Sequence, residues 1–173
     1  MKPAKKVAFG GICTALAVVI LLFSTVLPTM EYSIPAIAGL MLVPLVAEFG
    51  IRYALLGWGA ASILGLLLVP NREAAVLFVC FFGIYPILKA KLETQHNPVL
   101  EWIGKFLIFN ACVLVSYWLL IWVLGMGELM AELSAFTYGP LLLLLLGNVV
   151  FGLYDLAMSR LITLYFRRIH PHL

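Results

Sequence analysis

Charged residues are scarce in this sequence of 173 residues: Asp, Glu, Lys and Arg together make up 11%, whereas hydrophobic residues make up 64%. So small a charged fraction excludes an ordinary soluble globular protein and indicates a membrane protein. A membrane-spanning helix needs ~20 mostly apolar residues, so the chain has room for about six spans and for no separate soluble domain. We therefore expect an all-α integral membrane protein with a single domain, residues 1–173.

The sequence also lacks the motifs of common catalytic, metal and nucleotide sites. It contains no His-Glu-x-x-His, nucleophile elbow or phosphate-binding loop, and no histidine falls within an apolar stretch. Cys13, Cys80 and Cys112 lie in apolar stretches without a Cys-x-x-Cys pair or a nearby histidine, so we interpret them as small core residues. We expect no enzymatic activity, no metal and no cofactor, and any ATP-driven step would belong to partner subunits.

Proline, glycine and charged residues divide the apolar sequence into six predicted membrane helices. Pro70 ends one helix, and Gly50 lies in a tight turn where it can take a positive φ. Asn71 is a good N-cap for the next helix, Glu73 in its first turn is favoured by the helix dipole, and Pro86 should bend that helix. The predicted helices are residues 7–27, 34–49, 51–69, 72–91, 102–124 and 138–166.

The basic residues predict the orientation of these helices, because Lys and Arg are retained on the cytoplasmic side of a membrane. With the N-terminus inside, ten of the eleven basic residues lie at or near the inner side, and only Arg72 is outside. Both termini are then cytoplasmic, and the positive charge is explained by the lipid bilayer rather than by nucleic acid. The ten inner residues are Lys2, Lys5, Lys6, Arg52, Lys89, Lys91, Lys105, Arg160, Arg167 and Arg168. The first apolar run is too long for a secretion signal and is expected to be a permanent span.

Polar and aromatic residues gather near the predicted outer surface. Aromatic residues often form a belt at the membrane interface, and Arg72 beside Glu73 is also compatible with a solvated ion pair. The sharper hypothesis is a small-molecule site roofed by the loop after the first helix and the loop before the fourth. Aromatic rings would stack on the ligand and Arg72 would bind an acidic group. The predicted substrate-binding residues are Arg72, Tyr32, Glu31, Tyr117, Trp118 and Tyr138, with Asn71, Glu73, Trp122 and Glu128 nearby.

Small residues recur along one face of the first predicted helix. Ala4, Ala8, Gly11 and Ala15 follow each other at spacings of four, three and four residues, which places them on one side of a helix. Small residues let a second helix approach closely in lipid, where packing drives association. The face is compatible with ordinary packing inside the chain and with a docking surface for another subunit.

A polar stripe follows the same spacing along the last predicted helix. Asn148, Gly152, Asp155 and Ser159 lie on one face, and Asp155 is roughly 15 Å deep in the membrane, where a carboxylate is expensive unless it is paired or hydrated. Asn110 lies at a similar depth and is the predicted partner of Asp155. The stripe is compatible with a structural hydrogen-bonded clasp, a proton site, or a switch that couples the inner face to the cavity.

The size of the chain, its six predicted helices with both ends inside, and Ala4-x-x-x-Ala8 and Gly11-x-x-x-Ala15 on the first helix together resemble a known family. These features resemble the S components, the substrate-binding membrane subunits of energy-coupling-factor type importers. The resemblance implies a subunit that captures a vitamin-like small molecule from outside and docks, through an Ala-x-x-x-Ala motif on its first helix, onto a transmembrane T subunit with two ATPases. Two other functions stay open: a membrane scaffold of a morphogenetic complex, and a proton-coupled carrier that uses Asp155.

Overall fold

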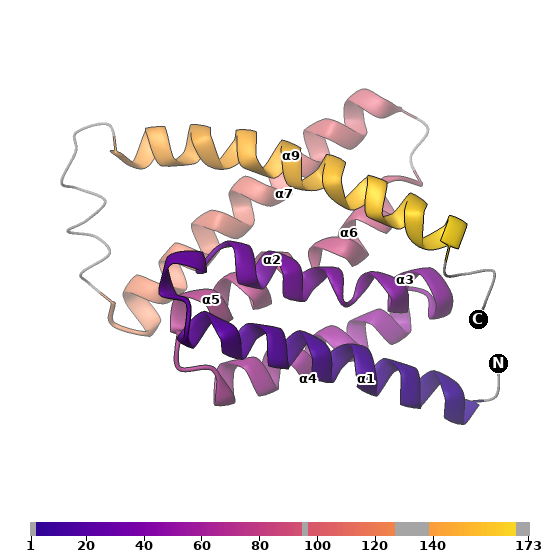
Figure 1. The fold of residues 1–173 in the computed structure, drawn as a ribbon. Coiled ribbons are helices and arrows are strands. Elements are labelled where there is room, and N and C mark those ends of the chain that lie inside the picture. The colour runs from indigo at the N-terminus through magenta and orange to yellow at the C-terminus, as the bar shows by residue number, and fades with distance from the viewer. Residues whose placement is uncertain (1–2, 95–96, 127–138, 169–173) are drawn as a thin grey trace. The chain divides into compact units, whose positions relative to one another are not determined.

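The computed structural model describes residues 3–94, 97–126 and 139–168, which contain helices and connections but no strand (Figure 1). The predicted all-α fold class is therefore confirmed for the part of the chain that the structure describes. The segments in chain order are α1 (Pro3–Leu22), η1 (Phe23–Thr25), η2 (Pro28–Met30), α2 (Ser33–Leu40), α3 (Val43–Phe49), α4 (Ile51–Leu68), α5 (Arg72–Leu77), η3 (Phe78–Phe82), α6 (Tyr85–Leu92), α7 (Pro98–Trp118), η4 (Leu119–Val123) and α9 (Gly139–Arg168).

Five helical segments of the described chain are long and apolar enough to cross a membrane. They are Ala4–Thr25, Ile51–Leu68, Arg72–Leu92, Pro98–Val123 and Leu141–Arg167. A sixth apolar segment, Ser33–Phe49, is shorter than these and corresponds to the predicted helix 34–49. The helix lengths and composition are those of a multi-pass membrane protein. Six spans and cytoplasmic termini stay predictions.

Two predicted helices are interrupted where proline removes a backbone donor. The segment 34–49 is broken between α2 and α3, because Pro44 lies in the first turn of α3 and has no N–H to continue the preceding helix. The segment 72–91 contains the π-helical turn η3 and then breaks at Gly83 and Ile84, immediately before Pro86 in the first turn of α6. The predicted disturbance at Pro86 is confirmed, and that at Pro44 was missed.

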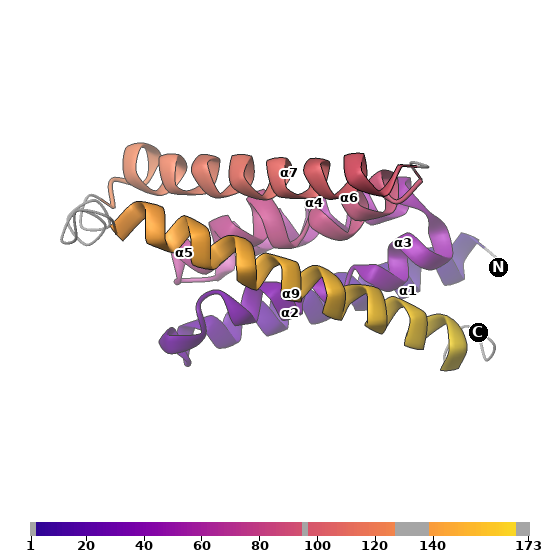
Figure 2. The same cartoon turned by 90° about the horizontal axis from the view of Figure 1, so that it is seen from above.

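The chain divides into two compact units, Met1–Lys105 and Phe106–Leu173. In the first unit α1 lies along α4 and α2, and α3 turns directly into α4 (Figures 1 and 2). That turn is made by Gly50, whose φ of +79° confirms the predicted positive value. The core is formed by Ala17 and Leu21 of α1 with Ala54 and Ala61 of α4, all 0% exposed.

The α4 side of this core is a row of small residues that was not predicted from the sequence. Ala54, Gly57, Ala61 and Gly65 are all buried and recur at spacings of three, four and four. A Cβ added at Gly57 would lie 2.6 Å from Leu45 Cδ2 and 3.3 Å from Thr14 Oγ1 of α1. We call these four residues the α4 stripe. They let the helices of the first unit approach closely, as small residues do in lipid.

The second unit consists of the part of α7 from Phe106 onward, η4 and α9. Its contacts centre on Phe151 of α9, whose ring stacks on Phe109 at 4.7 Å between centroids and meets Phe106 edge to face at 5.4 Å. Gly147 lies beside this group, where an added Cβ would be 3.4 Å from the Phe109 ring. Aromatic packing and a close helix approach therefore hold α7 and α9 together within this unit.

Candidate functional site

Polar side chains join the turn after α1 to the start of α5 in the first unit. Asn71 Oδ1 accepts a hydrogen bond from the backbone N–H of Ala74 at 3.0 Å, which confirms the predicted N-cap. Its Nδ2 donates to Glu31 Oε1 at 3.3 Å and lies 3.5 Å from the carbonyl oxygen of Ser24. Asn71 therefore uses its whole amide to begin one helix and to hold the preceding turn against it.

Tyr32 and Glu73 form a second connection between the same segments. The Tyr32 hydroxyl donates to Glu73 Oε1 at 3.0 Å, and Glu73 is 8% exposed. Glu73 stands in the first turn of α5, where the helix dipole stabilises a carboxylate. Tyr32 is half exposed, so its ring stays accessible while its hydroxyl is held. We call Glu31, Tyr32, Asn71 and Glu73 the outer cluster.

Arg72 is exposed, and its Nη1 donates to the carbonyl oxygen of Leu66 near the end of α4 at 2.5 Å. The donor that would bond this carbonyl in a continuing helix is the N–H of residue 70, which is a proline. Arg72 thus supplies the hydrogen bond that Pro70 cannot. The sequence carries the signal for this contact, a basic residue just after a proline that ends a helix, but the contact was not predicted.

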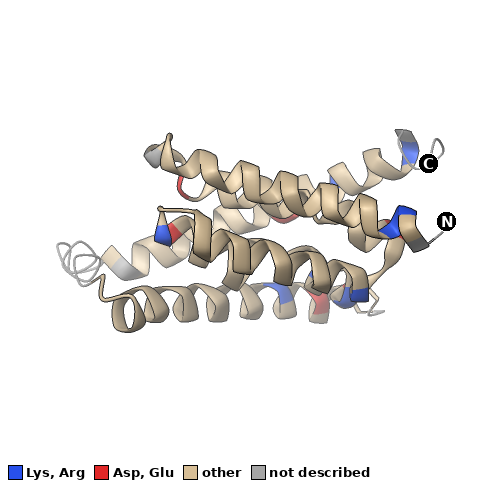
Figure 3. Cartoon of the chain, turned by 90° about the horizontal axis from the view of Figure 1, so that it is seen from below, with Lys and Arg blue, Asp and Glu red and all other residues tan. Residues whose placement is uncertain are grey.

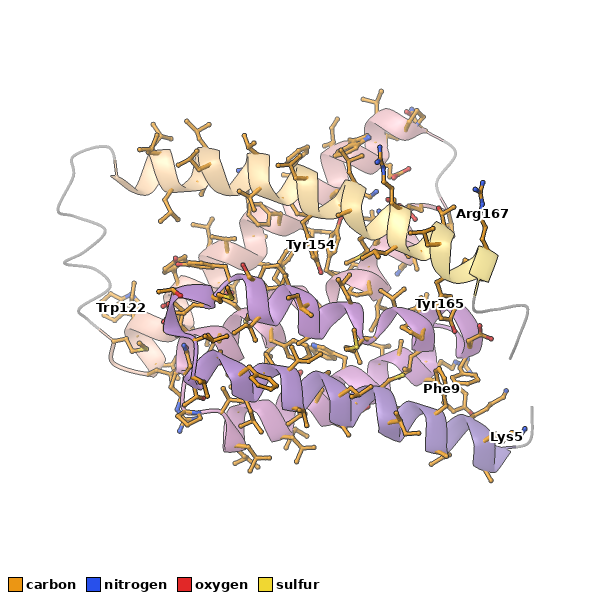
Figure 4. The ribbon with its side chains drawn as sticks, in the orientation of Figure 1. Lys5, Phe9, Trp122, Tyr154, Tyr165 and Arg167 are labelled. Carbon is orange, nitrogen blue, oxygen red and sulfur yellow. The ribbon has the colours of Figure 1, made fainter. Side chains whose placement is uncertain are left out.

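The other predicted substrate-binding residues do not belong to this unit. Tyr117 and Trp118 lie at the end of α7 in the second unit, where Trp118 is largely exposed. Trp122, labelled in Figure 4, follows them in η4 and is also exposed. Tyr138 and Glu128 lie outside the described residues. The structure thus brings Glu31 and Tyr32 together with the start of α5, and a ligand-binding role for all six residues stays a prediction.

The small-residue face of α1 is exposed along its whole length. Ala4, Ala8, Gly11 and Ala15 are each exposed, and a Cβ added at Gly11 would meet nothing within 4 Å. The opposite side of the helix carries the buried residues Ala17 and Leu21 of the core. We call the four small residues the α1 stripe. Figure 4 marks the N-terminal end of this helix with Lys5 and Phe9.

Asn110 and Asn148 form a reciprocal amide pair in the second unit. Each Nδ2 donates to the other Oδ1, at 2.9 and 3.0 Å, and each also donates to the carbonyl four residues earlier in its own helix. The predicted partnership of Asn110 with Asp155 is therefore wrong, because Asn148, two helical turns before Asp155, takes that place. Asn110 and Asn148 form the predicted type of hydrogen-bonded clasp by themselves.

Asp155 is 2% exposed on α9. Its backbone carbonyl accepts a hydrogen bond from Ser159 Oγ at 3.0 Å, and Thr163 Oγ1 donates to the Ser159 carbonyl at 2.9 Å. The hydroxyls of the predicted polar stripe thus bond their own helix. A groove of about 370 Å³ follows this end of α9, lined by Ser159, Arg160, Thr163 and Leu164. None of the five predicted substrate-binding residues that the structure describes lines it.

A cluster of opposite charges at the end of α6 was not anticipated. Lys89 and Lys105 are 1% and 2% exposed, and the ammonium groups of both contact Glu93 Oε1, at 2.6 and 3.1 Å. Lys105 also pairs with Glu101 at 2.6 Å and lies 5.4 Å from the centre of the Trp102 ring. The signal was the four-residue spacing in Lys89–Glu93 and in Glu101–Lys105, which brings opposite charges together on one helix face.

Charge is distributed unequally between the two ends of the first unit (Figure 3). At the end where α1 and α4 begin and α3 and α6 finish, six of its seven described basic residues are found, with three glutamates. The opposite end carries Arg72 with Glu31 and Glu73. The six basic residues are Lys5, Lys6, Arg52, Lys89, Lys91 and Lys105. This asymmetry has the form that the positive-inside rule describes.

No family model, curated protein or solved structure matches this chain. The described helices have the length and composition of a multi-pass membrane protein, and the first of them has an exposed small-residue face.

Proposed function

We propose that this chain is the substrate-binding membrane subunit of an energy-coupling-factor type importer, which captures a vitamin-like small molecule at the outer face of the cell membrane. The observation that carries the proposal is the exposed α1 stripe. The first unit buries its other small-residue row, the α4 stripe, inside its own core, whereas the α1 stripe is exposed and a Cβ added at Gly11 would meet no described atom within 4 Å. An uncovered row of small residues on a membrane helix is a surface to which another helix can dock closely.

The charge asymmetry supports the orientation that this function requires. If the basic end of the first unit is cytoplasmic, the outer cluster and Arg72 face the outside. A substrate would then be captured at the outer end, while a transmembrane T subunit docks along α1 and its two ATPases lie on the cytoplasmic side. The exposed guanidinium of Arg72 donates from Nη1 to the carbonyl oxygen of Leu66, and its other N–H groups are donors that an anionic substrate can use.

Docking is tested by placing a bulky side chain on the α1 stripe. Ala15→Leu should reduce recovery of the T subunit and ATPases with the tagged protein about tenfold, which corresponds to a loss of about 1.4 kcal/mol. Ala60→Leu is the matched control, because Ala60 is an exposed alanine on α4, outside the α1 stripe. Equal recovery of partners by the two variants would contradict docking through α1.

Substrate capture is tested by mass spectrometry of small molecules released from the purified protein. A bound vitamin-like compound supports the proposal, and an Arg72→Ala variant should lose binding of an anionic one. An empty protein recovered with a large assembly would instead favour the scaffold. Transport whose proton dependence disappears in Asp155→Asn would favour the proton-coupled carrier, because Asp155 is a buried acid on a spanning helix.

A further inference from the structure

The contacts of Lys89 and Lys105 converge on one oxygen atom. Both ammonium groups contact Glu93 Oε1, at 2.6 and 3.1 Å, so the two cations lie within about 6 Å of each other. Two like charges this close repel each other, and an anion between them outweighs that repulsion because it attracts both cations at a shorter distance. The carboxylate of Glu93 supplies that anion, with one oxygen serving both lysines.

Burial differs sharply between the cations and the anion of this cluster. The lysine side chains are 1% and 2% exposed, whereas the side chain of Glu93 is 39% exposed. A buried ammonium is costly without a partner, and Glu93 is a carboxylate that both lysines share, while Lys105 is also paired with Glu101. The Glu93 carboxylate approaches from the accessible side, at the residue that follows the last turn of α6.

We propose that Lys89 and Lys105 form a binding site for a single oxyanion, a phosphate or carboxylate group, which the chain's own Glu93 occupies in this structure. Each ammonium has three N–H donors and binds any oxyanion in the way that it binds a carboxylate. When Glu93 turns outward, an entering monoanion leaves the net charge of the cluster unchanged, because Glu101 stays on Lys105. Glu93 is thus a tethered competitor of the external anion.

The test replaces the tethered anion and supplies a free one. The full chain carrying Glu93→Ala is purified in a neutral detergent, and its Tm is measured in sodium phosphate and in sodium chloride of equal ionic strength. Phosphate at about a hundredfold excess over its Kd should raise the Tm of the variant by about 5 °C relative to chloride. The wild-type Tm should differ little between the two salts, because Glu93 competes for the site.

Glu101→Ala is the matched control, because it removes a carboxylate from the same lysine but leaves Glu93 between the two ammonium groups. It should be destabilised without a preference for phosphate. The double variant Lys89→Met with Glu93→Ala should also lose the preference, because it removes one of the two cations. A phosphate effect of equal size in all variants would overturn the proposal, since it would reflect a general salt effect.

A second comparison distinguishes a lipid headgroup from a soluble anion. Glu93→Ala is placed in phosphatidylcholine nanodiscs with and without phosphatidylglycerol, and inorganic phosphate is added to each. Stabilisation by phosphatidylglycerol alone assigns the site to a lipid phosphate, and stabilisation by inorganic phosphate assigns it to a soluble anion. If neither stabilises the variant, the proposal is wrong. It is equally wrong if Glu93→Ala and Glu93→Gln cannot be recovered folded even in phosphate, which should replace the missing carboxylate.

Discussion

Two helices of the first unit carry nearly the same small-residue spacing and place it in opposite environments. The α1 stripe, Ala4 to Ala15, is exposed, whereas the α4 stripe, Ala54 to Gly65, is buried in the core. An added Cβ meets nothing within 4 Å at Gly11, but it lies 2.6 Å from Leu45 at Gly57. Spacing therefore indicates that a membrane helix can be approached closely, and the three-dimensional packing decides whether the approach comes from inside the chain.

The largest effect is expected at the most tightly covered glycine of the α4 stripe. Gly57→Val should lower the free energy of unfolding by about 3 kcal/mol, because its branched side chain would overlap Leu45 and Thr14. Unfolding in increasing SDS, followed by tryptophan fluorescence, measures the loss. Gly59→Val is the control on the same helix, where an added Cβ meets nothing within 4 Å. Equal losses of stability in the two variants would show that the covered position of Gly57 and the open position of Gly59 do not differ in packing.

A smaller loss is expected where a polar pair, rather than small residues, holds two helices. Asn110→Ala should cost about 1 kcal/mol, because the amide of Asn148 loses its partner on α7. The double variant with Asn148→Ala should cost little more than either single change, since each alone breaks the reciprocal pair. Strictly additive losses in this double-mutant cycle would contradict coupling between the two amides.

Gly65 of the α4 stripe should tolerate a methyl group better than Gly57. An added Cβ would lie 3.3 Å from Leu21 Cδ1, the end of a flexible side chain, so Gly65→Ala should cost about 0.5 kcal/mol. The same SDS titration measures it. A loss as large as that of Gly57→Val would show that Leu21 cannot move.

The smallest effect on folding is expected on the α1 stripe. Gly11→Val should change the free energy of unfolding by no more than about 0.5 kcal/mol, because the added side chain projects into open space. The same variant should nevertheless reduce recovery of partner subunits about tenfold. Intact folding with reduced docking would separate the two stripes by function. A loss of stability comparable to that of Gly57→Val would show that α1 is covered by its own chain.

Local rules predicted much of the chain, and they failed where tertiary packing decides. The cap at Asn71, the positive φ of Gly50 and the disturbance at Pro86 depend on a few neighbouring residues and were predicted correctly. The partner of Asn110 and the burial of Lys89 depend on how helices turn toward each other. A lysine near a helix end is expected at the membrane surface by the positive-inside rule, which takes no account of a glutamate four residues away.

The predicted substrate-binding residues also separate into local and tertiary features. The sequence predicted a substrate-binding role for Glu31, Tyr32 and Arg72, which stays a prediction, and the structure joins Glu31 and Tyr32 by hydrogen bonds to Asn71 and Glu73 at the start of α5. The sequence did not indicate that Glu73 is a buried hydrogen-bond acceptor, because an acidic residue in the first turn of a helix is usually explained by the helix dipole alone. Arg72 donates a hydrogen bond to the carbonyl oxygen of Leu66. This contact becomes evident from the sequence only when one considers that Pro70 has no backbone N–H to donate to that oxygen.

The single-residue turn at Gly50 has a consequence for the sidedness of this protein in the membrane. With one residue between α3 and α4, their facing ends lie within a few ångströms of each other, so Glu48 and Arg52 lie at about the same level of the bilayer. A glycosylation acceptor or a protease site engineered at this turn would therefore report the sidedness of both helices at once.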